Sequence, residues 1–176
     1  MTTARSRIIH TRTSGRHVPD LLQVIFTAEL LWPSPCLWLV SPWISDIPVL
    51  DNRTNGFLPF EPRWARIQVS LSQVLGKLLE FGTTVHVATR PDDHNTAFLD
   101  RMRRLAEPDG LPLRLHSSEE LHEKGFLGDG FYLSGSMNFT FKGITLNEEA
   151  VHYSADPAFV AENRILFADR WGGEIR

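Results

Sequence analysis

The most informative segment of the chain is residues 122–149, which read HEKGFLGDGFYLSGSMNFTFKGITLNEE. It opens with a histidine and a lysine two positions apart, continues to an aspartate, and then reaches a Gly-Ser-Met-Asn run. Imidazole, ammonium, hydroxyl and amide groups are the kinds of side chain that attack and hold phosphoryl groups. The segment therefore gathers polar groups of the types that catalytic sites use.

Each polar residue of this segment can be given a chemical role. A neutral imidazole at His122 can attack phosphorus and form a covalent phosphohistidine. Lys124 lies on the same face if the pair sits at the end of a strand, because side chains alternate there, and it would supply a fixed positive charge. Ser136 and Asn138 would donate hydrogen bonds to the phosphoryl oxygens, and Gly135 would permit the close backbone approach that this requires.

The pattern resembles the HKD signature of phospholipase D-like enzymes, in which His-x-Lys is followed by Asp and later by Gly-Ser-x-Asn. The lysine-to-aspartate interval matches, and the aspartate-to-glycine interval is one residue shorter, which we attribute to a tightened hairpin at Asp129-Gly130. The resemblance is tight over residues 122–149 and loose over residues 18–171. Within the looser part, Ser41-Pro42-Trp43 is similar to the loop after the first core strand of many superfamily members.

The chain holds one copy of the motif, and its other histidines lack a lysine two positions later. The leaving oxygen needs a proton, so a second histidine must face the first. The resemblance implies the arrangement of single-motif bacterial nucleases, in which two subunits pair about a two-fold axis and each donates one histidine. One His122 would attack while the other acts as general acid and then base, with no metal or other cofactor.

Two acidic positions complete the predicted site. Glu149 follows Asn138 by eleven residues, where the nuclease relatives place an acid that orients a catalytic histidine, and Glu148 is the alternative. A carboxylate bonded to imidazole fixes its tautomer and raises its basicity. We expect Asp129 to hold the hairpin, because it stands beside Gly130, and not to act in the chemistry.

The periodicity of apolar residues predicts an α/β fold, which the resemblance makes a phospholipase D-like α-β-α sandwich with a mixed central sheet. Proline, glycine and asparagine favour an irregular loop over residues 46–63. Helices are expected over residues 19–31, 64–80, 92–106 and 157–171. Strands are expected over residues 37–40, 83–89, 111–116 and 150–154, and on both sides of Asp129-Gly130.

Length and composition bound the protein class. The 176 residues, 42% apolar and 22% charged, suit one globular domain, which we place at residues 18–176. Residues 1–17 carry four arginines and no acid, and predict a basic N-terminal arm that either touches a polyanion or is solvated. Prolines break the most apolar run, which argues against a membrane span, and the single cysteine, Cys36, favours a cytoplasmic location.

The leading hypothesis is a metal-independent phosphodiesterase that cleaves nucleic acid, with DNA favoured over RNA as the substrate, as a homodimer. The chain looks like a subunit of a bacterial restriction or antiviral defence complex, similar to the phospholipase D-like component of deazaguanine-DNA modification and restriction clusters. Two alternatives are a phospholipid or small-diester hydrolase, and a subunit that grips phosphate backbones without cutting. Trp38 and Trp43 are interpreted as core packing in preference to platforms for stacking bases.

Overall fold

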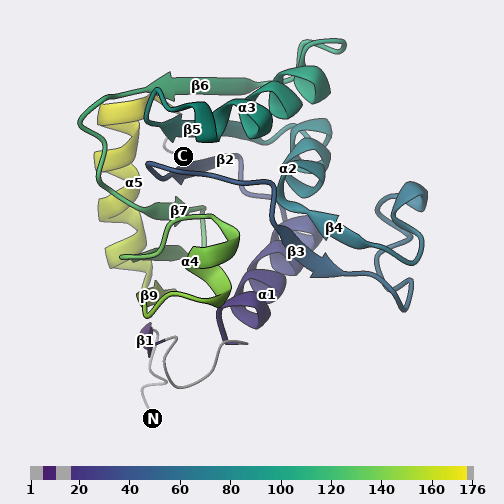
Figure 1. Ribbon diagram of the computed structural model, residues 1–176, viewed down its shortest axis with the longest axis horizontal. Helices are drawn as coiled ribbons and strands as arrows, with labels where there is room; N and C mark the ends of the chain where they lie inside the picture. The colour runs from purple at the N-terminus through teal and green to yellow at the C-terminus, as the bar shows by residue number, and fades with distance from the viewer. Residues whose placement is uncertain (1–5, 11–16, 174–176) are drawn as a thin grey trace.

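The computed structural model describes residues 6–10 and 17–173. Its central sheet has seven strands in the order β1-β9-β8-β7-β2-β5-β6, and a small second sheet pairs β3 with β4 (Figure 1). The strands are β1 (Ser6–His10), β2 (Cys36–Val40), β3 (Pro48–Asp51), β4 (Gln68–Ser70), β5 (Thr84–Thr89), β6 (Leu113–Ser117), β7 (Gly125–Leu127), β8 (Tyr132–Gly135) and β9 (Ala150–Ser154). The helices are α1 (His17–Leu31), α2 (Leu71–Glu80), α3 (Asp93–Ala106), α4 (Phe141–Thr145) and α5 (Pro157–Trp171), with a short 3₁₀ helix at Pro62–Trp64.

The central sheet is mixed, as predicted. Strands β2, β5 and β6 run parallel to one another. From β2 outward on the other side, β7, β8, β9 and β1 pair antiparallel in succession. All five residues of β2 are buried, because this strand is the junction of the two halves and is covered on both faces.

Two hydrophobic cores lie on opposite faces of the sheet. The larger core packs α1, α2 and α3 against one face, with Phe26 and Phe98 among its fully buried side chains. The smaller core packs α5 against the other face and contains Trp38 and Phe167. Burying one such side chain contributes roughly 1.5–3 kcal/mol, so each helix is held mainly by this packing. Figure 1 shows α5 on the opposite side of the strands from α1 and α2.

The segment between β2 and α2 differs from the prediction. The region expected as an irregular loop contains β3, which is one strand of the small sheet, and the start of the 3₁₀ helix. The helix expected from Trp64 begins only at Leu71. Gln73 accepts a hydrogen bond from the backbone N–H of Ser70 at 2.9 Å, and the Asp46 carboxylate accepts one from Ser72 N at 2.8 Å. These contacts fix the N-terminus of α2 and leave Trp64 as a buried residue of the preceding loop.

Two further differences concern shorter segments. The five-residue helix α4 was not predicted, because it is shorter than two turns and shows no apolar periodicity. Residues Ser6–His10, placed in the N-terminal arm, form the edge strand β1, which pairs antiparallel with β9. Residues 1–5 and 11–16 of that arm lie outside the described residues. The predicted boundary at residue 18 thus does not separate β1 from the sheet.

Several strands of the central sheet begin or end on the same side of it, and we call this side the edge that carries the site. Val40 ends β2, Gly125 begins β7, and these two residues pair directly. Gly125 also pairs with Ser134, next to the end of β8, while β5 ends at Thr89 on the other side of β2. The loops that follow or precede these strands must therefore meet, and they contain the histidine–lysine and Gly-Ser-Met-Asn segments.

Candidate active site

A pocket of about 540 Å³ lies at this edge of the sheet. It contains His122, Lys124, Ser136 and Asn138, four residues that the sequence assigns to phosphate chemistry, together with Gly135. Its complete lining is Trp43, His122, Glu123, Lys124, Tyr132, Ser134, Gly135, Ser136 and Asn138. Thus the fold brings two separate segments of the motif to one cavity.

His122 and Lys124 directly precede β7 and do not belong to it. Residues 122–124 belong to no helix or strand, so the expected strand begins one residue after the lysine. His122 is exposed, and its imidazole makes no hydrogen bond to the part of the chain that the structure describes. Its ring is therefore available to a substrate, as a nucleophile must be.

Lys124 is the buried member of the pair, with 9% of its surface exposed. Its ammonium donates a hydrogen bond to the backbone carbonyl of His122 at 2.6 Å, which ties the two residues together. Burial lowers the pKa of Lys124, the Glu149 carboxylate raises it, and the Arg90 guanidinium lowers it again. The ammonium keeps two further N–H donors that could reach phosphoryl oxygens.

Glu149 lies beside the Gly-Ser-Met-Asn loop. Its carboxylate accepts a hydrogen bond from the hydroxyl of Ser136 and another from Asn147 Nδ2 at 3.2 Å. The Ser136 hydroxyl also accepts one from Ala150 N at 3.1 Å. The Glu149 carboxylate therefore fixes the hydroxyl of Ser136 and raises the pKa of Lys124. Its expected role of orienting a histidine stays a prediction.

Gly135 holds a backbone conformation that a larger residue would strain. Its φ is +143°, and a Cβ at this position would lie 2.1 Å from the carbonyl oxygen of Ala150. Ser136 N donates to that same carbonyl at 3.1 Å. The absence of a side chain thus lets the loop approach β9 closely and turn Ser136 into the pocket.

Asn138 is positioned by a residue that the sequence reasoning did not assign to the site. The hydroxyl of Ser41 lies 3.2 Å from Asn138 Oδ1 and 2.9 Å from the carbonyl of Trp43, and it is fully buried. Because the amide oxygen faces Ser41, the Asn138 NH₂ group is left for the pocket. The Ser41-Pro42-Trp43 segment was noticed for its resemblance, and that signal could have led to this contact.

Asp129 lies at the other end of β7, away from the pocket. Its carboxylate forms an ion pair with Arg164 of α5 at 2.7 Å, and its backbone N–H donates to Ser34 Oγ at 2.8 Å. Ser34 in turn donates to the buried Glu29 carboxylate of α1, whose pKa burial raises. This motif residue thus joins helices from both faces of the sheet.

The remaining walls of the pocket carry shifted ionisable groups. Burial raises the pKa of Glu123, and its ion pair with Arg170 opposes that shift. Burial also raises the pKa of Tyr132 to about 12. No group of three or more His, Cys, Asp or Glu residues suited to a metal ion occurs among residues 6–10 and 17–173.

Comparisons with known proteins show the fold to be of the phospholipase D type. NucT from Helicobacter pylori superposes with a TM-score of 0.62 at 9% identity, covering 93% of each chain. Nuc from Salmonella typhimurium, a phospholipase D family member, gives 0.59 at 17% identity, covering 94% of this chain and 93% of its own. Polyphosphate kinase from Porphyromonas gingivalis gives 0.61 at 16% identity, covering 97% of this chain and 27% of its own.

The likeness is visible in three dimensions only, since no family model and no curated protein matches the sequence. At these identities it shows the phospholipase D-like fold, which confirms the predicted fold class. Shared fold leaves the reaction to be argued from the site, because one fold supports different activities. Within the described residues, every helix is too short or too polar to cross a membrane.

Proposed function

We propose that this chain is a metal-independent phosphodiesterase that cleaves nucleic acid, specifically DNA. The observation that carries the proposal is the single pocket that holds His122, Lys124, Ser136 and Asn138. An exposed imidazole stands there beside a buried ammonium, a hydroxyl and an amide. These groups supply a nucleophile and a set of donors for the oxygens of a phosphodiester.

The proposed reaction proceeds in two displacements. His122 attacks phosphorus, so that a P–N bond forms and the P–O bond to the leaving group breaks. The leaving oxygen takes a proton from the imidazolium of a second histidine, His122 of the partner subunit. Water then attacks phosphorus, gives its proton to that second imidazole, and releases His122 as the P–N bond breaks.

Lys124 and Asn138 would stabilise the charge that develops on the phosphoryl oxygens. Lys124 is already fixed by the His122 carbonyl, and Asn138 by Ser41, so neither needs to reorganise on binding. Glu149 holds Ser136 and favours the charged form of Lys124. In the homodimer, Glu148 or Glu149 is also proposed to orient one of the two histidines.

The proposal includes a setting for this activity. A single, fully buried Cys36 fits a cytoplasmic protein, and the motif resembles that of subunits from bacterial restriction and antiviral defence systems. A partner protein of such a complex could supply the affinity for DNA that a net charge of −3 does not.

The test is an incubation of the purified protein with labelled single- and double-stranded DNA in excess EDTA. His122→Ala should lose about 10⁴-fold or more of the activity, because the covalent intermediate cannot form. His94→Ala is the matched control, since His94 is an exposed histidine outside the pocket lining. Retained cleavage in His122→Ala would contradict the mechanism.

The same preparation separates the alternatives. A phospholipid hydrolase would release headgroup from vesicles, and excess DNA would not inhibit it. A subunit that only grips phosphate backbones would bind DNA in a salt-dependent manner, cleave nothing, and keep its affinity in His122→Ala. The shared site further predicts a dimer in solution, which analytical ultracentrifugation can check.

A further inference from the structure

Trp43 is placed differently from the tryptophan with which the sequence reasoning grouped it. Trp38 is fully buried in the smaller core, and its indole N–H donates to the Gly172 carbonyl at 2.8 Å. Trp43 is half-buried and forms part of the wall of the active-site pocket. Core packing therefore accounts for Trp38 but leaves the pocket-facing surface of Trp43 without a structural role.

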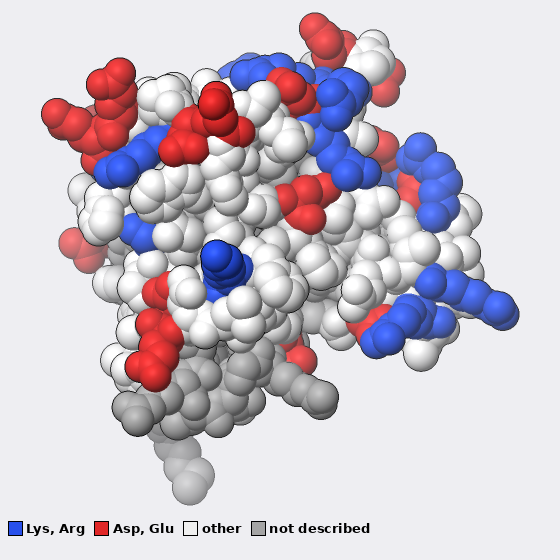
Figure 2. All heavy atoms as spheres, viewed as in Figure 1, with Lys and Arg blue, Asp and Glu red and all other residues white. Residues whose placement is uncertain are grey.

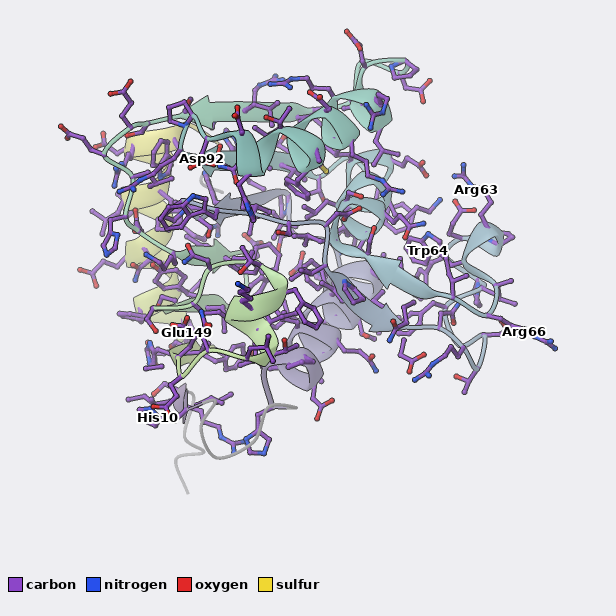
Figure 3. All side chains as sticks on the ribbon, viewed as in Figure 1. His10, Arg63, Trp64, Arg66, Asp92 and Glu149 are labelled. Atoms are coloured by element: carbon purple, nitrogen blue, oxygen red, sulfur yellow. The ribbon has the colours of Figure 1, made fainter. Side chains whose placement is uncertain are left out.

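Two contacts hold the indole of Trp43 in place. Its N–H donates to the Asp92 carboxylate at 3.1 Å, and the Arg90 guanidinium lies 5.4 Å from the ring centroid. Asp92 is itself fixed as the N-cap of α3, where it accepts from His94 N. Figure 3 shows Asp92 and Glu149 on the same side of the molecule, far from the projecting loop with Trp64. The ring is therefore a fixed surface, not a mobile side chain.

Arg90 links this surface to the nucleophile. Its Nε donates to the carbonyl of Leu121, the residue before His122, at 2.7 Å. Arg90 is not among the residues that line the pocket, so it contacts the indole from outside it. The guanidinium thus connects the ring to the backbone next to His122, while Trp43 itself lines the pocket.

The charges around the pocket indicate how a polyanion could be held there. Figure 2 shows basic side chains gathered over α3 and the β3–β4 loop, whereas acidic ones predominate where the segment between β6 and β7 runs. That segment carries Glu119, Glu120 and Glu123 close to His122. These carboxylates oppose the attraction of phosphates on that side of the pocket, although Arg170 pairs with Glu123, and a neutral contact to the substrate gains importance there.

We propose that Trp43 is a stacking platform for the nucleobase next to the scissile phosphate. This inference rests on the proposed function and names the feature of the substrate that the site recognises, an unpaired base. An aromatic ring accepts any base on its π-face, so recognition would be tolerant of sequence. A base in a duplex is already stacked and paired, and unstacking it costs free energy that a single strand does not lose.

The experiment compares two labelled single strands, a dodecathymidylate and the same backbone with abasic residues throughout. Trp43→Leu should lower kcat/KM on the dodecathymidylate about 5- to 150-fold, the usual range for loss of one stacked base. The abasic strand has nothing to stack and should lose less than twofold. Trp43→Phe keeps an aromatic face and should retain most of the activity on the dodecathymidylate.

Trp32→Leu is the matched control, because Trp32 is 85% exposed at the end of α1 and does not line the pocket. It should behave as the wild type on both strands. Equal losses in Trp43→Leu on the two strands would mean that Trp43 only supports the loop before His122, and would overturn the proposal. An unchanged kcat/KM on the dodecathymidylate would overturn it as well.

Binding distinguishes a failure of stacking from a failure of the proposed function. Fluorescence anisotropy with His122→Ala measures affinity for both strands whether or not the wild type cleaves them. Tighter binding of the dodecathymidylate that disappears in His122→Ala/Trp43→Leu supports stacking, even if the wild type shows no cleavage. Equal affinity for both strands in His122→Ala contradicts it, even if the wild type is an active nuclease.

Discussion

The two ends of β7 carry the same motif but treat its charged groups in opposite ways. At the start of the strand, His122 is exposed and Lys124 has only a backbone carbonyl as hydrogen-bond partner among the described residues. At the far end, Asp129 is bonded both to Arg164 of α5 and to Ser34, which holds Glu29 of α1. The start of the strand keeps hydrogen-bond donors and a nucleophile available to a substrate. At the far end, the charge of Asp129 is paired with Arg164 of the same protein.

This difference shows that the motif encodes both chemistry and architecture. Groups that must react with a substrate cannot be saturated by the protein, so they cost stability where they are buried. Groups that join helices to the sheet gain from being saturated. Substitutions at the two ends should therefore separate activity from stability, and four variants test this in order of expected size.

Among these four variants, the largest effect is expected for Lys124→Met. Removal of the fixed positive charge should lower activity about 10²- to 10³-fold, as for loss of one oxyanion donor. Because burial lowers the pKa of Lys124, the fold disfavours its charged form. Methionine is uncharged and of similar length, so the variant protein should unfold at the same or a higher urea concentration than the wild type. A loss of stability together with activity would remove the contrast between the two ends.

The next effect is expected for Asp129→Asn, which should lower the free energy of unfolding by about 2 kcal/mol. The change leaves the guanidinium of Arg164 buried without its counter-charge, while the pocket stays intact. Urea unfolding measures the loss, and kcat per folded molecule should stay within about threefold of the wild type.

A double substitution sharpens the test of that end of the strand. In Asp129→Asn/Arg164→Met, the uncompensated cation is gone, so a substantial part of the lost stability should return. Additive losses in the double variant would show that the ion pair is not what holds α5 to the hairpin.

The smallest effect concerns the pH dependence of the reacting end. The lowered pKa of Lys124 means that its charge, and the activity that depends on it, is lost at a lower pH than for an ordinary lysine. The Glu149 carboxylate raises that pKa, so Glu149→Gln should move the alkaline decline of kcat/KM to still lower pH. A profile between pH 7 and 10.5 measures this, and a shift to higher pH would contradict the assignment.

The parts of the fold that the sequence predicted are those with local signals. Strand β9 and helix α5 have the predicted bounds, and a proline after an acidic cap marks the start of the helix directly. The strands β3 and β4 were missed, since they are only four and three residues long and the segment that joins them is rich in proline, glycine and asparagine. The start of α2 was misplaced although Ser70 and Gln73 form a local capping box there, and only the added contacts of Asp46, 24 residues before Ser70, depend on the fold.

The residue types and spacing of the motif determined which atoms are available for chemistry, and these follow from residues 122–149 alone. Tertiary structure decided where the atoms go. It carried Asp129 to the anchored end of β7, and it brought Ser41 to Asn138, 97 residues away, by pairing β2 with β7 and β7 with β8. It also turned Trp43 to the pocket and Trp38 to the core. Such contacts depend on which strands pair and which faces are covered, and no local pattern in the chain specifies that.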